Sequence, residues 1–332
     1  MTRKTMLRGG AAALALGMLV AAATSYAQDA KKYSIATIVK ISGIQWFNRM
    51  DEGVKKFAAD TGNKAFQVGP AKADAQLQVQ LVEDMIAQGV DAIAVVPFAP
   101  EALEPVLKKA MDKGIKVVSH EASEIQNVNW DVEAFSNAAY GEHIMQALGK
   151  CMDGKGEYAV FVGSLTSKSH NQWVDAAIAY QKKNFPDMKL VGSKNETFDD
   201  QQKAYAKTQE LLRAFPNVRG FQGSASTDVA GIGLAVEERG MADKTCVMGT
   251  SLPSIASQYL DTGAVDMISF WDPALAGYAM NKIAVMLLEG KQPTNGMDLG
   301  LPGYEKVDIQ GKVIYGKAWV DVTKDNASQY PF

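Results

Sequence analysis

The chain alternates strand-like and helix-like segments along most of its length, and this alternation runs twice. Residues 33–39 form an apolar run rich in β-branched residues, and a helical spacing of apolar residues follows over 47–57. The same order of strand and helix restarts at the apolar run 158–162. Because parallel strands need a crossover between them, this order predicts an α/β fold with two Rossmann-like lobes, each built on a parallel sheet.

The first 27 residues have the pattern of a secretory signal peptide. Three basic residues within the first eight precede an apolar stretch over 9–23, and Ser25 and Ala27 are the small residues that a signal peptidase reads. We therefore predict cleavage before Gln28 and a periplasmic location. The apolar stretch is shorter than the roughly 20 residues of a membrane-spanning helix, and an uncleaved anchor is the alternative.

The charge balance argues against some partners. The chain has 34 basic and 37 acidic residues, a formal net charge of −3, and removal of the three basic residues in 1–27 leaves −6. A negative chain is a poor match for nucleic acid or anionic lipid. Cys151 and Cys246 each precede a predicted strand. An oxidising compartment permits a disulfide between them, and two buried free thiols are the alternative.

Catalytic and metal-binding motifs are absent from the sequence. It contains no G-x-G-x-x-G, no phosphate-binding P-loop, no H-E-x-x-H and no G-x-S-x-G. Its three histidines and two cysteines lack the spacing of metal ligands. We therefore predict a protein that is not an enzyme and that uses no cofactor or metal.

Polar and aromatic residues follow the predicted strands directly. In open parallel sheets, ligands bind beyond the carboxyl ends of the strands. This rule selects Lys40 and the segments 97–98, 120–121, 164–171, 224–228, 250–251 and 271–272. Carboxylates accept hydroxyl protons, lysine donates to oxygen, and aromatic faces pack on C–H groups. The selected set therefore suits the vicinal hydroxyls of a sugar.

Several candidate residues also have a purely structural interpretation. The alternative for Lys40 is a solvated surface position, and for Glu121 it is a surface ion pair. Phe47 fits the buried stripe of its helix, whereas Trp46 lies off that stripe and is a candidate for lining a cleft. Asp228 begins a predicted helix and either caps it or contacts a ligand.

Five segments carry a resemblance to a known family: Ile38-Val39-Lys40, 75–88, Asn171-Gln172-Trp173-Val174, Phe270-Trp271-Asp272 and the C-terminal 326–332. Over 31–332 the chain resembles the periplasmic sugar-binding proteins of ABC importers, which have the ribose-binding-like type I fold. Within that family it is most similar to the autoinducer-2-binding and rhamnose-binding branch.

The resemblance implies a periplasmic binding protein type I fold, whose lobes are joined by a three-segment hinge. The crossings are expected near 122–126, 271–273 and 300–304. The N-terminal lobe would then comprise 31–123 plus 273–302, and the C-terminal lobe 124–271 plus 303–332. A ligand would bind between the lobes, which close around it.

The resemblance also implies which individual residues of this sequence contact the ligand. Lys40 matches the lysine of the branch, and Asp272 matches its acidic residue after tryptophan. Glu121 stands where autoinducer-2 binders have aspartate, Ser169-His170 replaces their Asp-Gln pair, and 224–226 replaces a Pro-x-Ala stretch. These three departures favour a different compact sugar, such as rhamnose or a pentose, with apiose as one candidate. The predicted ligand-binding residues are Lys40, Trp46, Phe47, Glu121, Ser169, His170, Asn171, Ser224, Ser226, Asp228 and Asp272.

The same resemblance implies the partners. They are a small sugar and the membrane subunits of an ABC permease, which has a separate ATPase; a chemoreceptor is a further partner compatible with this class. The alternatives are a binding protein for autoinducer-2 uptake and a secreted enzyme acting on sugars. A sugar-responsive repressor is disfavoured by the predicted signal peptide and by the lack of an N-terminal helix-turn-helix pattern.

Overall fold

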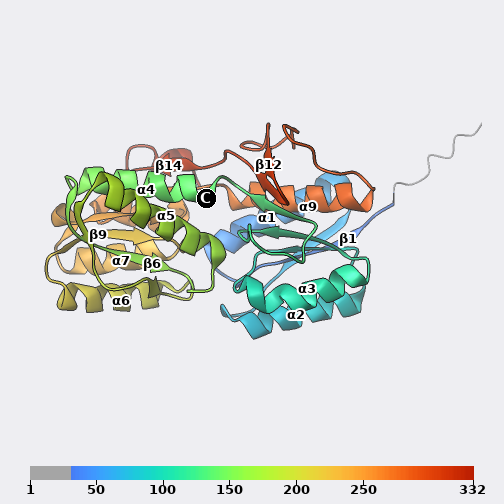
Figure 1. Ribbon diagram of the computed structural model, residues 1–332, viewed down its shortest axis with the longest axis horizontal. Coiled ribbons are helices and arrows are strands. Elements are labelled where there is room, and N and C mark those ends of the chain that lie inside the picture. Colours follow the sequence, from blue (N-terminus) through green and yellow to red (C-terminus); the bar gives the residue numbers. More distant parts are fainter. Residues whose placement is uncertain (1–30) are drawn as a thin grey trace, which may run out of the picture. The chain divides into compact units, whose positions relative to one another are not determined.

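The first lobe, called the N-lobe below, is built on a seven-stranded sheet with the order β12-β13-β5-β4-β3-β1-β2 (Figure 1). The computed structural model describes residues 31–332, so the predicted signal peptide lies outside the described residues. The N-lobe strands are β1 (Ser34–Ile38), β2 (Lys64–Val68), β3 (Ala92–Val95), β4 (Lys116–His120), β5 (Trp130–Glu133), β12 (Asp308–Gln310) and β13 (Val313–Tyr315). Its helices are α1 (Gln45–Thr61), α2 (Ala75–Gln88), α3 (Pro100–Asp112) and α9 (Pro273–Leu288).

The second lobe, called the C-lobe below, has the strand order β14-β11-β10-β9-β6-β7, and β8 pairs with β6. Its strands are β6 (Lys155–Val162), β7 (Asp187–Leu190), β8 (Asn195–Glu196), β9 (Val218–Gly223), β10 (Cys246–Thr250), β11 (Met267–Phe270) and β14 (Val320–Val322). Its helices are α4 (Asn137–Cys151), α5 (Lys168–Asn184), α6 (Gln201–Ala214), α7 (Asp228–Glu238) and α8 (Pro253–Thr262), with short 3₁₀ turns η1 (Ala242–Lys244) and η2 (Ala327–Gln329).

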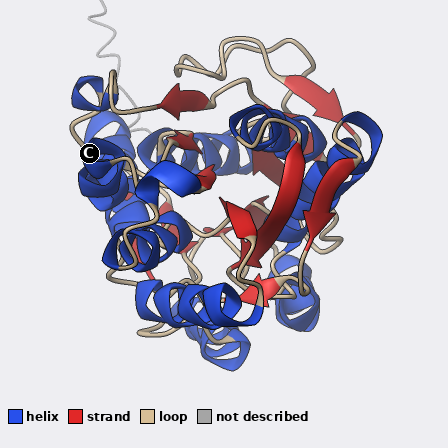
Figure 2. Ribbon diagram, turned by 90° about the vertical axis from the view of Figure 1, so that its left-hand side faces the viewer, coloured by secondary structure: helices blue, strands red, loops and turns tan. Residues whose placement is uncertain are grey.

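Helices cover both faces of each sheet (Figures 1 and 2). In the N-lobe α1 packs on α9 and α2 packs on α3, and in the C-lobe α4 packs on α5 and α6 on α7. Strand β3 is buried along its whole length, as expected for a central parallel strand covered on both faces. The prediction of a two-lobed α/β fold with mostly parallel sheets is confirmed.

Two glycines allow the closest helix contacts. A Cβ atom at Gly53 of α1 would lie 1.8 Å from the carbonyl oxygen of Ala274 in α9. A Cβ atom at Gly141 of α4 would lie 2.1 Å from the carbonyl oxygen of Trp173 in α5. Each lobe therefore fixes one helix against its neighbour through direct backbone contact, and the second pair places Trp173 beside the cleft.

The chain crosses between the two lobes three times, and two of these crossings lie at other residues than the sequence predicted. Strand β5 pairs with β4 and β13, so the chain leaves the N-lobe after Glu133, at 134–136. Because β12 and β13 also belong to the N-lobe sheet, the last crossing is at 316–319 instead of 300–304. The sequence of strand β5 is Trp-Asp-Val-Glu. Because two of these residues are acidic, the segment lacks the apolar run from which a buried strand is predicted. The middle crossing lies at 271–272, between β11 and α9.

Cys151 and Cys246 form a disulfide within the C-lobe, which settles the alternatives left open by the sequence. Their Cα atoms lie 6.0 Å apart, within the range that a disulfide spans. Cys151 is the last residue of α4 and Cys246 the first of β10. The bond therefore lies at the opposite end of β10 from the carboxyl end that faces the cleft. Within 31–332, no helix combines the length and apolarity needed to cross a bilayer.

Candidate ligand-binding site

A small cavity lies where the carboxyl ends of both sheets face each other. The N-lobe lines it with Lys40, Ile44, Trp46, Phe47 and Glu121, and the rest of its wall is His170, Trp173, Asp199, Ser224, Ser226, Thr250 and Trp271. Its central free volume is about 10 Å³, which is room for about one water molecule. The lobes are therefore closed onto each other at this point.

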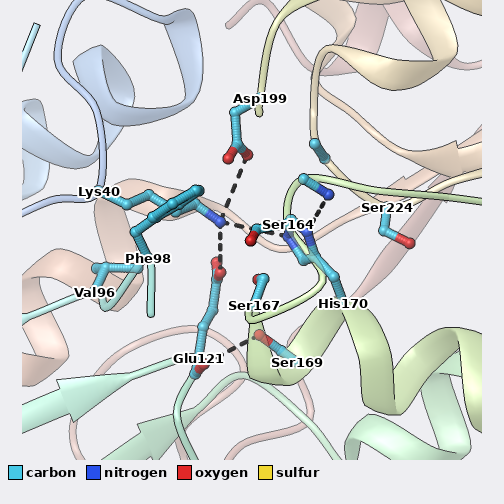
Figure 3. A network of polar contacts seen from close by, with 12 residues as sticks. Lys40, Val96, Phe98, Glu121, Ser164, Ser167, Ser169, His170, Asp199 and Ser224 are labelled. Carbon is cyan, nitrogen blue, oxygen red and sulfur yellow. Dashed lines mark hydrogen bonds and ion pairs between the residues drawn. The ribbon is translucent and has the colours of Figure 1, made fainter. Parts of the chain in front are cut away.

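Lys40 lies at the centre of a network of polar contacts in the cavity wall (Figure 3). Its Nζ atom lies 3.2 Å from Oε2 of Glu121, in the same lobe, and 3.6 Å from Oδ1 of Asp199, in the other lobe. All three side chains are almost fully buried. Burial by itself lowers the pKa of Lys40, but the charges of Asp199 and Glu121 outweigh burial and raise the pKa overall. Lys40 is therefore a cation held between carboxylates of both lobes.

His170 presents a hydrogen-bond donor to the same point. Burial, followed by the charge of Lys40, holds the pKa of His170 well below its usual range, so the ring is neutral. Its Nδ1 atom accepts a hydrogen bond from the backbone N–H of Gly163 at 3.0 Å, which leaves the ring proton on Nε2. Nε2 lies 3.4 Å from Nζ of Lys40, and two donors cannot bond each other. Together they form a paired donor site for a ligand oxygen.

Asp199 is brought into the cavity by an unusual stretch of backbone. Phe198 and Asp199 both have left-handed φ angles, 55° and 53°. A Cβ atom at Gly163 would lie 2.8 Å from Oδ2 of Asp199, so a side chain there would displace the carboxylate. Oδ2 is buried and has no hydrogen-bond partner among the described residues. Asp199 therefore holds an acceptor atom ready for a ligand hydroxyl.

Aromatic rings form one wall of the cavity. Trp46 and Trp271 meet edge to face at 4.7 Å between ring centroids, and Trp173 packs against Trp271 at 5.8 Å. The indole N–H of Trp271 donates to Nε2 of His120 at 3.2 Å, which fixes the orientation of Trp271. These rings present an apolar surface that suits the C–H face of a sugar ring.

Hydroxyl groups line the remaining edge. Ser224 and Ser226 follow β9, and Thr250 ends β10. The Oγ atom of Ser224 is buried, and nothing in the part of the chain that the structure describes accepts its proton or donates to it. Thr250 Oγ1 lies 3.0 Å from the hydroxyl of Tyr140. The cavity thus combines charged donors, carboxylate acceptors and hydroxyls over an aromatic wall.

Seven of the eleven predicted residues line this cavity: Lys40, Trp46, Phe47, Glu121, His170, Ser224 and Ser226. The structure places the other four outside its lining. Ser169 donates to the carbonyl of Glu121 at 3.2 Å, and Asn171 donates to the carbonyls at positions 164 and 167. Asp228 accepts from the backbone N–H groups of 224 and 225 and from Oγ1 of Thr197. These three side chains therefore support the loops that carry the cavity residues.

Asp272 is the fourth residue outside the cavity lining. It caps α9 by accepting from the N–H of Ala274 at 2.9 Å, and both of its oxygens accept from the guanidinium of Arg49, at 2.9 and 2.7 Å. The guanidinium also lies 4.0 Å from the ring centroid of the C-lobe residue Phe332. The carboxylate is therefore used by Arg49 and the helix end, and we leave Asp272 out of the proposed site.

Replacement of Asp272 by alanine (D272A) is expected to lower the free energy of unfolding by about 1–2 kcal/mol, since it removes a helix cap and a partly exposed ion pair. Sugar affinity should change less than threefold. Urea unfolding and calorimetry measure the two quantities, and D272N, which keeps a capping oxygen, is the matched control. A tenfold loss of affinity without loss of stability would return Asp272 to the site.

Asp228 gives a prediction on pH. Burial raises its pKa to about 7, although Thr197 and two backbone N–H groups donate to the carboxylate. The folded state therefore holds a proton that the unfolded state releases near pH 3.8. Its contribution to stability is complete below that pH and falls as the pH rises through 7. D228N keeps the shape of the side chain but does not titrate. The free energy of unfolding of D228N should therefore rise relative to that of the wild type between pH 4 and 8. A difference that is constant with pH in urea unfolding would contradict this assignment.

Five lining residues are missing from the predicted set: Ile44, Trp173, Asp199, Thr250 and Trp271. Thr250 is the last residue of β10 and Trp271 follows β11, so the carboxyl-end rule selects both and a signal for them existed. Asp199 follows β8, which has only two residues and leaves no periodic pattern to read. Among residues 31–332, no group of three or more histidine, cysteine or acidic side chains is placed to hold a metal ion.

Two lobes of this topology, closed over a polar cavity at the carboxyl ends of their sheets, define a hinged solute-binding protein. The sequence matches the family model described as "Periplasmic binding protein domain" over residues 35–292. The chain therefore belongs to the periplasmic binding protein family. The match supports the predicted resemblance to the sugar-binding proteins of ABC importers and identifies the chain as a binding protein, not an enzyme.

Individual relatives agree with this family. A D-ribose/D-allose-binding protein of Pseudomonas aeruginosa is 34% identical over 97 residues, which is 28% of this chain and 30% of that protein. An ABC transporter solute-binding protein of Clostridium phytofermentas with bound L-rhamnose has a TM-score of 0.83 at 23% identity, covering 90% of this chain and 98% of that one. LsrB of Clostridium saccharobutylicum in complex with AI-2 has a TM-score of 0.84 at 20% identity, covering 90% and 100%. At these identities the two structures establish the fold alone.

Proposed function

We propose that the protein captures a compact sugar between its lobes in the periplasm and delivers it to the membrane permease of an ABC importer. The proposal rests above all on the buried Lys40 cluster, where donors and acceptors from both lobes converge beside unpartnered polar atoms. The proposed ligand is a pentose, a deoxyhexose or a branched sugar such as apiose or rhamnose. The permease, with its separate ATPase, is the proposed partner, and a chemoreceptor is a further one.

Binding requires the lobes to open and close again. With about 10 Å³ of free volume, the cavity has no room for a sugar in the conformation described above. Lys40 and Glu121 belong to the N-lobe, whereas His170 and Asp199 belong to the C-lobe. Opening at the three crossings therefore moves the first two side chains away from the other two. On closure, a sugar oxygen takes the place between Lys40 and His170, and a hydroxyl donates to Asp199. The ligand thereby bridges the lobes and favours the closed state.

Selectivity follows from burial. Each polar group of the cavity that lacks a partner in the closed state costs roughly 1–3 kcal/mol, so a sugar with a misplaced hydroxyl binds several-fold to more than a hundredfold more weakly. Lys40 matches the autoinducer-2 branch and keeps autoinducer-2 as a second candidate, whereas Glu121 stands where that branch has aspartate. The serine and histidine at 169–170 and the serines at 224 and 226 favour the sugar.

A thermal-shift screen of residues 28–332 tests the proposal. The panel contains D-apiose, L-rhamnose, D-xylose, D-arabinose, xylitol and autoinducer-2, since a ligand that binds only the folded state raises the melting temperature by mass action. One compact sugar should raise it clearly, and K40M should abolish that shift. A shift with autoinducer-2 alone would establish the second candidate, and no shift with any compound would overturn sugar binding.

A further inference from the structure

A second, larger chamber lies outside the ligand-binding cavity. It has about 460 Å³ of free space and is lined by Ile41, Gly43, Ile44, Gln45, 71–73, 198–201, Lys203, Thr227 and Ile255. Ile44 and Asp199 line both spaces, so the chamber adjoins the inner cavity at these two side chains. The two spaces therefore share these two side chains as a common wall.

The walls of the chamber combine apolar side chains with polar and charged ones, which are Gln45, Lys72, Asp199, Asp200, Gln201, Lys203 and Thr227. Ile41 and Ile44 come from the N-lobe, and Phe198 and Ile255 face them from the C-lobe. On the N-lobe side, the backbone N–H of Ser42 donates to the carbonyl at position 70 at 2.8 Å and ties together the two loops that form the wall. The wall on this side is therefore held in place.

Phe198 is the most unusual of these residues. Its side chain is 37% exposed and its φ angle is 55°, a left-handed value that bulky residues rarely adopt. The backbone N–H of Phe198 donates to the carbonyl of Gly163 at 2.7 Å, and the ammonium of Lys203 lies 4.3 Å from the ring centroid. An exposed aromatic ring on a strained and well-anchored backbone offers a prepared stacking surface.

Two residues of the chamber lining carry buried polar atoms without partners. Oδ2 of Asp199 and Oγ1 of Thr227 are both buried, and neither has a hydrogen-bond partner within residues 31–332. The chamber thus combines hydroxyl-binding atoms with the apolar side chains of Ile41, Ile44, Phe198 and Ile255. A molecule that suits this lining carries both a polar group and an apolar ring.

We propose that the chamber holds the aglycone of a glycoside, so that the ligand is a sugar bound in the inner cavity with an aromatic ring stacked on Phe198. The inference rests on the proposed sugar-binding function and deepens it. The space is ample, since a cavity of roughly 150 Å³ already binds benzene. Beside Phe198, the isoleucines Ile41, Ile44 and Ile255 favour an aromatic ring, and a second sugar, which the polar side chains of the lining could bond, is the competing occupant that the test includes.

Calorimetry with methyl and phenyl glycosides of D-xylose and L-rhamnose, in both anomers, tests this inference. One phenyl glycoside should bind roughly tenfold more tightly than its methyl counterpart, because its ring is buried against Phe198. F198A should remove most of this preference, measured as the ratio of phenyl to methyl glycoside affinity, and F198W should retain it. L165A, which alters an exposed leucine outside the chamber lining, is the control and should change neither affinity.

The outcomes separate the two proposals. Binding of the free sugars together with exclusion of every phenyl glycoside would overturn the aglycone chamber and leave sugar capture intact. A phenyl preference that survives in F198A, or a disaccharide that binds more tightly than any phenyl glycoside, would also overturn it. If no sugar or glycoside binds at all, the proposed function itself fails.

Discussion

Substitution of Asp199 by asparagine (D199N) is expected to weaken sugar binding by roughly 100-fold. The carboxylate is buried, lies 3.6 Å from Nζ of Lys40 and has one oxygen without a hydrogen-bond partner among the described residues. An amide keeps the volume, but it loses the charge that pairs with Lys40 and presents an N–H where a hydroxyl has to donate. Loss of one partner of a buried charged contact typically costs 2–5 kcal/mol. Calorimetry with the sugar identified by the thermal-shift screen measures the effect.

The neighbouring Asp200 provides the control for this substitution. It caps α6 through the backbone N–H groups of Gln202 and Lys203 and is exposed. Asparagine is an equally good cap, so D200N should leave sugar affinity within twofold of the wild type. If D199N also stayed within threefold while K40M lost binding, Asp199 would only balance the charge of Lys40, and the proposed hydroxyl contact would be wrong.

Lys40 and Glu121 could be predicted from the sequence because each lies next to a strongly apolar strand. Lys40 follows the run that contains β1, and Glu121 follows β4 directly. The carboxyl-end rule therefore placed both side chains at the cleft before any contact was known. The ion pair between them and the approach of Asp199 are long-range features, and sequence spacing carries no information about them.

Asp199 and Asp272 are two acidic residues whose roles in the structure differ from those predicted from the sequence. Asp199 reaches the cavity because Phe198 and Asp199 both adopt left-handed φ angles although neither is a glycine. No local sequence pattern predicts this conformation. Asp272 was selected as a ligand contact, yet Pro273 after it is the first residue of α9, and a proline at that position favours a capping role for the preceding aspartate. A helix cap could thus have been predicted, whereas the contact with Arg49, 223 residues away, could not.

The boundaries between the lobes also depend on contacts that the local sequence does not predict. The acidic residues of β5 are buried beside the hinge: Ser119 donates to Asp131 at 2.6 Å, and Asn137 donates to Glu133 at 3.2 Å. Hydrogen bonds from neighbouring elements make such residues tolerable in a buried strand. A search for apolar runs passes over them, and the first crossing was consequently expected too early.

Removal of the disulfide is the second large expected effect. The bond closes a loop with a sequence separation of 95 residues, so the double variant C151A/C246A should lose about 4–5 kcal/mol of unfolding free energy by the chain-entropy estimate. Replacing both cysteines avoids leaving a reactive thiol. Urea unfolding of the double variant and of the wild type, with and without a reducing agent, measures the loss. Reduced wild type should match the double variant.

Sugar affinity should respond differently from stability in this variant. Cys246 begins β10, whereas Thr250, at the other end of the same strand, lines the cavity. The disulfide therefore restrains the unfolded chain and the far end of the C-lobe, and it contacts none of the cavity residues. We expect the affinity of C151A/C246A to stay within twofold of the wild type below its unfolding transition. A large loss of affinity with unchanged stability would mean that the bond positions the cavity through β10 and does not chiefly stabilise the fold.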